Sequence, residues 1–238
     1  MQGEQYVCTV CGYNMVGYCP SHCPFCGAAR NKFITSEECS ANFQVKGTAV
    51  SDRVTRLNSV PALGIEHAAY RIETKGKAFW IDCPSSFDKS LEPADVLMFT
   101  HHHFLGASNQ YRDLFSCQVR IHKLDSAHDL CRGFAFDVTF DQNFEEDGIE
   151  AFHIDGHTPG FSFYIFEDIL LVCDYVLLKD DGMIFNPYGP AAETIAGGEK
   201  IRKILDGRTI NQVCGYNYVV AWEEWNKRFG PLPEPGGH

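Results

Sequence analysis

Two closely spaced pairs of cysteines near the N-terminus constrain this chain more than any other feature. Five of its 11 cysteines fall within the first 26 residues, and four of them form C-x-x-C-G motifs at residues 8–12 and 23–27. A segment this short cannot bury a sufficient hydrophobic core and needs disulfides or a bound metal to fold. An odd cysteine total argues against a disulfide framework, whereas each motif presents two thiolates on a tight turn. We therefore predict a tetrahedral four-sulfur metal site with the ligands Cys8, Cys11, Cys23 and Cys26.

The residues alone permit either zinc or iron in this four-thiolate site. Cys19 and His22 lie between the two motifs, and we do not expect them to be ligands. The stretch YVCTVCGYNMVGYCPSHCPFCGAARNKF resembles the rubredoxin-like module of rubrerythrins, in which four thiolates bind one iron; Tyr13, Lys32 and Phe33 fit that pattern. The resemblance favours iron and implies a one-electron centre. A structural zinc ribbon is the alternative.

Composition excludes several classes of protein. The 238 residues are 45% hydrophobic and 21% charged, which is an ordinary globular balance. A formal net charge of −11 argues against nucleic acid as a partner, because phosphate binding needs clustered Lys and Arg. We find no apolar run near the roughly 20 residues of a membrane span, and no signal-peptide pattern at the start. We expect a cytoplasmic protein without a membrane partner.

Strands and helices alternate from about residue 50 onward. AAYRIETKGKAFWID predicts two strands around a turn at Lys75 and Gly76, and ILLVCDYVLL predicts one strand. AAETIAGGEKIRKIL has helical spacing that two glycines weaken, INQVCGYN predicts the last strand, and AWEEWNKRF predicts a short final helix. We expect an α+β fold with sheets at its core. The expected divisions are a four-cysteine module at 1–33, a connector at 34–49 and a main domain at 50–238.

The main domain carries a second group of metal-binding residue types, each just after a predicted strand. His101 and His103 follow the apolar run ADVLMF and, being two residues apart at a strand end, can chelate one ion while His102 faces elsewhere. His157 lies in GHTPG and Asp174 in LLVCDY. We predict a mononuclear site with an open position, in which Asp174 also has a candidate catalytic role. The remaining His and Cys residues are interpreted as core or surface residues: His67, His122, His128, His153, Cys83, Cys117 and Cys131.

The order of the segments FWIDCPSS, THHH, GHTPG and LVCDY resembles that of the metallo-β-lactamase superfamily, from about residue 50 to at least residue 218. The resemblance implies an αββα sandwich. It also implies that His101, His103 and His157 match the ligands of the family's first metal site and that Asp174 matches its bridging carboxylate.

Two departures from the family pattern concern the second metal site. The family's first motif is His-x-His-x-Asp-His, but here the Asp-His pair after Phe104 is missing. The stretch CGYN at residues 214–217 has no His where the family has its last ligand, and the only later histidine is His238. We infer one metal rather than two. The loss of the Asp that orients the attacking water makes phosphodiester chemistry a weaker hypothesis.

Three functions stay open at this point. In the first, an iron–thiolate module delivers electrons to iron in the three-His/Asp site, a scheme that draws on a resemblance to flavodiiron proteins. In the second, a mononuclear zinc site hydrolyses an acyl, thioester or lactone bond and the module is structural. In the third, the chain is a non-catalytic sensor of a metal or ligand. The expected enzyme class is accordingly a metal-dependent oxidoreductase or hydrolase. Candidate partners are a small-molecule substrate or ligand, an electron-transfer protein and a second copy of the chain.

Overall fold

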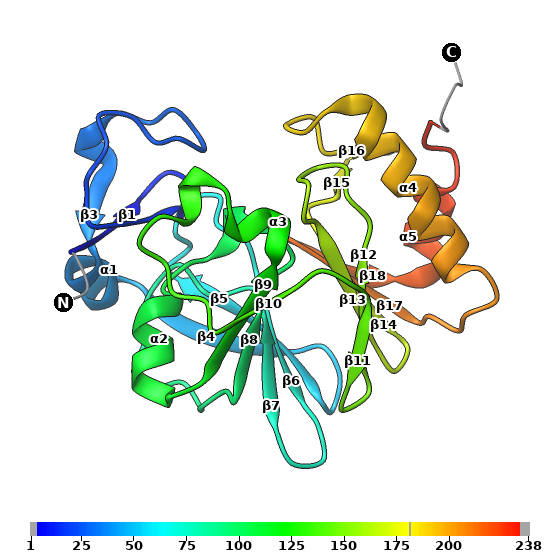
Figure 1. The fold of residues 1–238 in the computed structure, drawn as a ribbon, viewed down its shortest axis with the longest axis horizontal. Coiled ribbons are helices and arrows are strands. Elements are labelled where there is room, and N and C mark those ends of the chain that lie inside the picture. The colour runs from blue at the N-terminus through cyan, green and yellow to red at the C-terminus, as the bar shows by residue number, and fades with distance from the viewer. Residues whose placement is uncertain (1–3, 181, 234–238) are drawn as a thin grey trace. The chain divides into compact units, whose positions relative to one another are not determined.

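A computed structural model describes residues 4–180 and 182–233 of the chain (Figure 1). The chain divides into two compact units. The first comprises Met1–Ile121 and Ser126–Phe140, and the second comprises His122–Asp125 and Asp141–His238. Within the described ranges, every helix is too short or too polar to cross a membrane.

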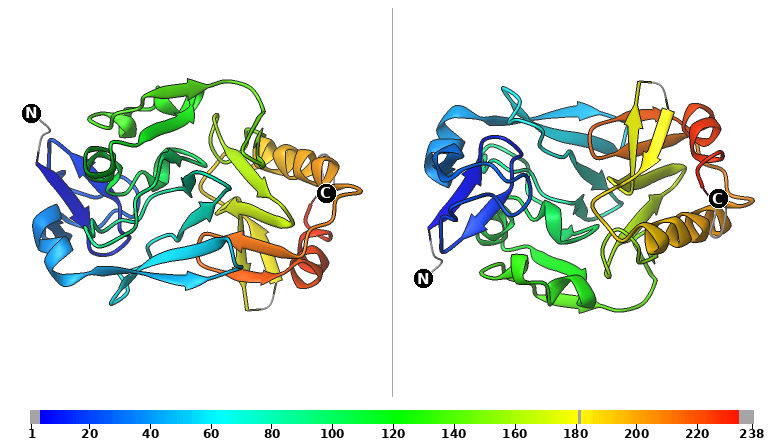
Figure 2. Two further views of the ribbon diagram at one scale, coloured as in Figure 1. Left: turned by 90° about the horizontal axis from the view of Figure 1, so that it is seen from below. Right: turned by 90° about the horizontal axis from the view of Figure 1, so that it is seen from above.

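The first unit begins with a small antiparallel sheet of order β2-β1-β3. Its strands are β1 (Gln5–Cys8), β2 (Asn14–Val16) and β3 (Phe33–Thr35). Helix α1 (Ser36–Asn42) follows at once, because Thr35 and Glu38 form a reciprocal capping box. Both views of Figure 2 show α1 next to these strands, where Val7 and Cys39 share a buried cluster.

The residues expected to form a connector are regular structure. After α1 the chain enters β4 (Gln44–Ala49), which pairs with β5 (Val54–Val60) over its whole length. β4 is therefore the edge strand of a seven-stranded sheet of order β10-β9-β8-β7-β6-β5-β4. Its other strands are β6 (Ala69–Glu73), β7 (Ala78–Ile81), β8 (Val96–Met98), β9 (Gln118–His122) and β10 (Val138–Phe140).

The predicted hairpin around Lys75 and Gly76 is present as the antiparallel pair β6 and β7. From β7 onward the pairing changes, since β7, β8 and β9 are parallel. The core of this unit contains Trp80, packed edge-on against Tyr111 of α2 (Ser108–Phe115). The short helical segments are η1 (Arg30–Lys32), η2 (His102–Phe104), α3 (Lys123–Ser126), whose residues are divided between the units, and η3 (Asp129–Cys131).

The second unit contains a six-stranded sheet of order β11-β12-β13-β14-β17-β18 and a two-stranded sheet, β15-β16. The strands are β11 (Phe144–Glu146), β12 (Ile149–His153), β13 (Ser162–Phe166), β14 (Ile169–Cys173), β15 (Val176–Lys179), β16 (Gly182–Phe185), β17 (Gln212–Gly215) and β18 (Val219–Ala221). Helices α4 (Ala191–Leu205) and α5 (Trp222–Phe229) match the two predicted helices. The glycines that weakened the α4 prediction have a packing role: a Cβ on Gly197 would meet the Tyr175 hydroxyl at 1.9 Å, and one on Gly198 would meet the Phe185 ring at 2.4 Å.

Two strand predictions in this unit were wrong. ILLVCDYVLL is two strands, because Cys173 has a φ of 53° and turns the chain between β14 and β15. INQVCGYN is not the last strand, since β18 follows it and pairs antiparallel with β17. At the first reversal the turning residue is a cysteine, which is not a typical turn former; at the second, Gly215 and Asn217 are turn-forming types, and the prediction did not use them.

Candidate metal centres

The two C-x-x-C-G motifs fold into the same turn. In the first, the Cys8 N–H donates to the Tyr13 carbonyl at 2.9 Å and the Gly12 N–H donates to the Cys8 carbonyl at 2.8 Å. The glycine has a φ of 76°, and its counterpart in the second turn has one of 74°. This left-handed conformation is the one that glycine adopts without a steric penalty. The corresponding residues of the second turn are Cys23, Gly27 and Ala28.

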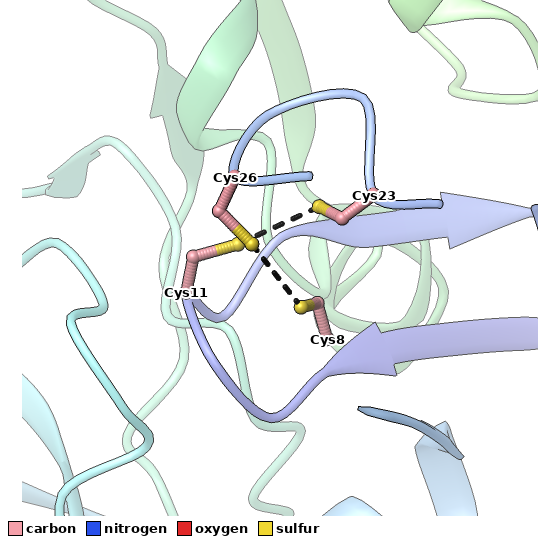
Figure 3. A group of neighbouring side chains, drawn as sticks. All are labelled: Cys8, Cys11, Cys23 and Cys26. Atoms are coloured by element: carbon pink, nitrogen blue, oxygen red, sulfur yellow. Dashed lines mark hydrogen bonds between the residues drawn. The ribbon is translucent and has the colours of Figure 1, made fainter. Parts of the chain in front are cut away.

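The four cysteine side chains of these turns point toward one another (Figure 3). Their sulfur atoms all lie within 4.8 Å, and the Cys8–Cys26 and Cys11–Cys23 sulfur pairs are each 3.7 Å apart. None of the four is in a disulfide. Metal–sulfur bonds of about 2.3 Å in a tetrahedron require sulfur–sulfur separations of about 3.8 Å. The thiols thus fit a tetrahedral ion. The thiols share hydrogen bonds: the bond with Cys11 is the main cause that lowers the pKa of Cys8, and the bond with Cys23 is the main cause that raises the pKa of Cys11.

The module that carries these turns is joined to the rest of the first unit by polar contacts. The Ile65 N–H donates to the Val10 carbonyl between the first pair of cysteines at 3.0 Å, and Gln5 Nε2 donates to the Gly106 carbonyl at 3.2 Å. An apolar cluster around Tyr13 and the cysteines includes Leu130. The four-cysteine site therefore has a fixed position within the first unit.

An aromatic contact links the second turn to the predicted histidine motif. Phe25, between Cys23 and Cys26, stacks on Tyr13 with ring centroids 5.9 Å apart. The same Phe25 ring meets the His103 ring edge-on at 5.4 Å. A residue inside the sulfur site thus contacts a predicted ligand of the second site, and sequence spacing gave no indication of this.

His101 and His103 lie together in the first unit, but not because they continue a strand. β8 ends at Met98, and residues 102–104 form the 3-10 turn η2, which brings the two rings to a centroid distance of 4.6 Å. A ligand nitrogen of each lies within 4.8 Å of one on the other. His102 stacks on His128 at 3.9 Å. The alternation argument assumed that a strand continues through these residues, whereas the turn η2 brings the two rings together.

Two residues that sequence reasoning did not identify as orienting groups hold His101. Thr100 Oγ1 lies 2.9 Å from both carboxylate oxygens of Asp82 and 3.0 Å from His101 Nδ1. When the hydroxyl donates to Asp82, its oxygen accepts from Nδ1–H, which leaves Nε2 as the nitrogen able to bind a metal. Asp82 itself has a φ of 60°, so the chain turns sharply where this carboxylate is presented.

His157 and Asp174 lie together in the second unit. His157 Nε2 is 3.5 Å from Asp174 Oδ2, and both side chains are buried. The turn before His157 requires glycine at 156, because φ is 96° there and a Cβ would meet the Tyr175 hydroxyl at 2.1 Å. Asp174 directly follows β14. The predicted positions at strand ends hold for Asp174, and for His157 in the loop after β12.

Buried polar groups hold these two residues as well. Asp125 accepts hydrogen bonds from Thr158 Oγ1 and from the Gly160 N–H, each at 2.9 Å, and so fixes the loop of His157. Asn186 Nδ2 donates to Asp174 Oδ2 at 2.9 Å. Neither Asp125 nor Asn186 has a motif around it, so no local sequence signal could have found them.

The histidines and cysteines interpreted as structural lie mostly in the core. His67 contacts the Cys83 carbonyl at 2.7 Å and stacks on Phe104, and burial lowers its pKa to about 4. His122 and His153 stack on one another at 3.9 Å. His238 lies outside the described residues. The remaining cysteines of this set are buried in the core of the first unit: Cys83, Cys117 and Cys131.

Comparison with known proteins finds likeness in structure only. No family model matches the chain, and no curated protein matches it. A metallo-β-lactamase from Pontibacter korlensis has a TM-score of 0.62 at 15% identity, over 79% of this chain and 96% of that one. FIM-1 from Pseudomonas aeruginosa, in a mono-zinc form, has a TM-score of 0.61 at 11% identity, over 79% and 92%. TTHA1623 in a di-iron-bound form has a TM-score of 0.53 at 19% identity, over 69% and 94%. The α+β chain therefore has the metallo-β-lactamase fold, the αββα sandwich that the sequence motifs implied, together with an N-terminal four-cysteine knuckle.

Proposed function

We propose that this chain is a redox-linked metalloprotein with two mononuclear centres. Four thiolates bind one iron in a rubredoxin-like centre, and three imidazoles with one carboxylate bind one iron or zinc. In this proposal, the ligands of the second centre are His101 and His103 from the first unit together with His157 and Asp174 from the second, as their sequence motifs predict.

The donor types support the second centre. Three imidazoles and a carboxylate suit zinc or iron and leave a coordination position for a small molecule. Within each unit two donors lie close together, His101 with His103 and His157 with Asp174. Buried polar residues orient them: Asp82, Thr100, Asp125 and Asn186. Such outer hydrogen bonds are typical of metal sites. Similar folds occur in proteins named as mono-zinc and di-iron forms, so both metals remain candidates.

The observation that carries the redox link is the contact between Phe25 and His103 at 5.4 Å. A purely structural ribbon could attach to any face of the first unit. Here the aromatic ring flanked by Cys23 and Cys26 touches a ligand of the other centre. An iron at the cysteines would supply a one-electron couple. The shared contact gives that couple a short path to the imidazole.

A mononuclear hydrolase is the second candidate. Several proteins with the same fold are named as metallo-β-lactamases, and one of them is a mono-zinc form. A zinc ion held by three imidazoles lowers the pKa of bound water and polarises an acyl oxygen. In this alternative the four-cysteine module is a structural zinc site.

Metal content distinguishes the two candidates. The full chain is purified without oxygen or chelators, iron and zinc are counted by mass spectrometry, and the visible and electron paramagnetic resonance spectra are recorded. The redox proposal expects a coloured protein with one iron per four-cysteine site and a second metal at the histidines. Zinc in both centres would overturn it and favour the hydrolase. A four-cysteine metal with an empty histidine centre would favour a sensor.

The proposal extends to partners and location. The open coordination position suits a small-molecule substrate or ligand, and an iron–thiolate couple needs an electron-transfer protein as donor. Reduced thiolates are stable in the cytoplasm, where glutathione and thioredoxin keep cysteines reduced. Chemical cross-linking at low and high protein concentration would test the candidate homodimer.

A further inference from the structure

Both hydrogens of the Asn186 side-chain amide are donated to one predicted ligand, Asp174. Nδ2 lies 2.9 Å from Asp174 Oδ2 and 2.9 Å from the Asp174 backbone carbonyl. An amide nitrogen carries two hydrogens, so each of these acceptors takes one. The amide oxygen accepts from the Tyr188 N–H at 3.0 Å. The side chain is 4% exposed, so water does not compete for these bonds.

The geometry at His157 fits this assignment. Asn186 Nδ2 is 3.4 Å from His157 Nε2, which is longer than a good N–H hydrogen bond, and both amide hydrogens are already used. His157 Nε2 lies 3.5 Å from Asp174 Oδ2. The imidazole nitrogen and the carboxylate thus lie side by side at a spacing that suits ligands of a common ion.

The loop that carries Asn186 also holds the backbone of His157. A Cβ on Gly189 would lie 2.6 Å from the His157 carbonyl oxygen and 2.7 Å from its Cα. Only a glycine lets the two backbones approach this closely. One short loop after β16 therefore fixes both ligands of the second unit, one through a side-chain amide and the other through close packing.

We propose that Asn186 is the positioning residue of the histidine centre, because its amide holds the Asp174 carboxylate beside His157 Nε2. The inference rests on the proposed metal centre. The two donated hydrogen bonds fix the side chain and the backbone carbonyl of Asp174 relative to one another, so the carboxylate is presented to the ion in a single orientation.

The test counts cobalt ions at the histidine centre. Protein with a loaded four-cysteine site and a stripped histidine centre is titrated with Co²⁺, which is followed by its visible absorption and counted by mass spectrometry. Wild type should stop at one equivalent. Asn186→Leu removes both donated bonds and should weaken the affinity by about 10–100-fold. Asn186→Leu should also shift the visible absorption of the bound cobalt, because Asp174 is no longer held in one orientation.

Asn109→Leu is the matched control. Asn109 is equally buried and bonds the Gly133 carbonyl and the Ala135 N–H in the first unit, so its loss should leave the cobalt spectrum and stoichiometry unchanged. If wild type takes up no cobalt at the histidine centre, the proposed function fails. If wild type binds one ion and the Leu variant binds it equally well and with the same spectrum, the role of Asn186 alone is overturned.

Discussion

The ring of Phe25 meets the ring of His103 edge-on, with centroids 5.4 Å apart and planes at 64°. Phe25 also stacks on Tyr13, whose backbone closes the first cysteine turn. One side chain therefore connects both cysteine turns with the first histidine motif, all within the first compact unit. Any displacement of the cysteine module would move this ring against the imidazole.

Replacing Phe25 with Leu should uncouple the two centres while leaving both metals bound. Leu keeps the apolar volume but removes the aromatic pairs, each of which contributes about 0.5–1.5 kcal/mol. We expect a loss of about 1 kcal/mol in the free energy of unfolding. We also expect slower reoxidation of the reduced thiolate centre in the presence of the histidine-bound metal, measured by stopped-flow absorption. Phe115→Leu removes a ring of the first unit that packs on Trp80 and Tyr111 and should not alter this rate. Equal rates in wild type and F25L would exclude Phe25 as the link.

The glycines of the two cysteine turns should respond differently to alanine. Gly27 has open space around it, so Gly27→Ala costs only the left-handed strain, about 1–2 kcal/mol. Gly12 has the same backbone conformation, but a Cβ there would lie 2.5 Å from Ser85 Oγ and 2.8 Å from Glu66 Cβ. Overpacking adds about 1–3 kcal/mol. Denaturant unfolding of the metal-loaded protein should give a lower free energy of unfolding for G12A than for G27A. G12A should also lose its metal faster to a chelator. Equal stabilities would mean that the module is not seated on Glu66 and Ser85.

The elements predicted correctly are those whose conformation depends on residues close together in the sequence. The Lys75–Gly76 turn, the α4 spacing and the two cysteine turns are each contained within a short window of sequence. Features set by distant contacts were not predictable. The Asp125 bond to Gly160 joins residues 35 apart, and the contact of Phe25 with His103 depends on how the module packs. The edge strand β4 was not predicted, because it is mostly exposed and Val45 is the only large apolar residue among its alternating positions.

Asp125 should be essential for the loop of His157. Its buried carboxylate accepts from Thr158 Oγ1 and from the Gly160 N–H, and hydrogen bonds to a charged group contribute about 1.5–3 kcal/mol each. Asp125→Ala leaves both donors buried without this acceptor and should cost about 3 kcal/mol or more. Asp125→Asn keeps an oxygen for the Gly160 N–H and should cost less. Urea unfolding measures the series, with the exposed Asp129→Ala as control, expected within about 0.5 kcal/mol of wild type. A neutral D125A would show that the loop is held by other contacts.

Glu66 should make the protein less stable as the pH rises toward neutrality. Its side chain is 9% exposed, accepts hydrogen bonds from the N–H and hydroxyl of Ser59, and has a pKa that burial raises to about 7. In the unfolded chain the pKa is near 4.5. Between these values the folded state keeps a proton that the unfolded state has lost, so the free energy of unfolding falls with pH, by up to about 3 kcal/mol, and is level above pH 7.

Glu66→Gln isolates this contribution, because the amide oxygen can still accept from Ser59 and carries no titratable proton. His67, whose pKa burial lowers to about 4, contributes with the opposite sign, but it does so equally in both proteins. The stability difference between E66Q and wild type should therefore be constant below about pH 4.5, grow in favour of E66Q between about pH 4.5 and pH 7, and then stay constant. Urea unfolding at half-unit pH steps gives this curve. A difference that does not change with pH would show that Glu66 has the same pKa in the folded and the unfolded protein.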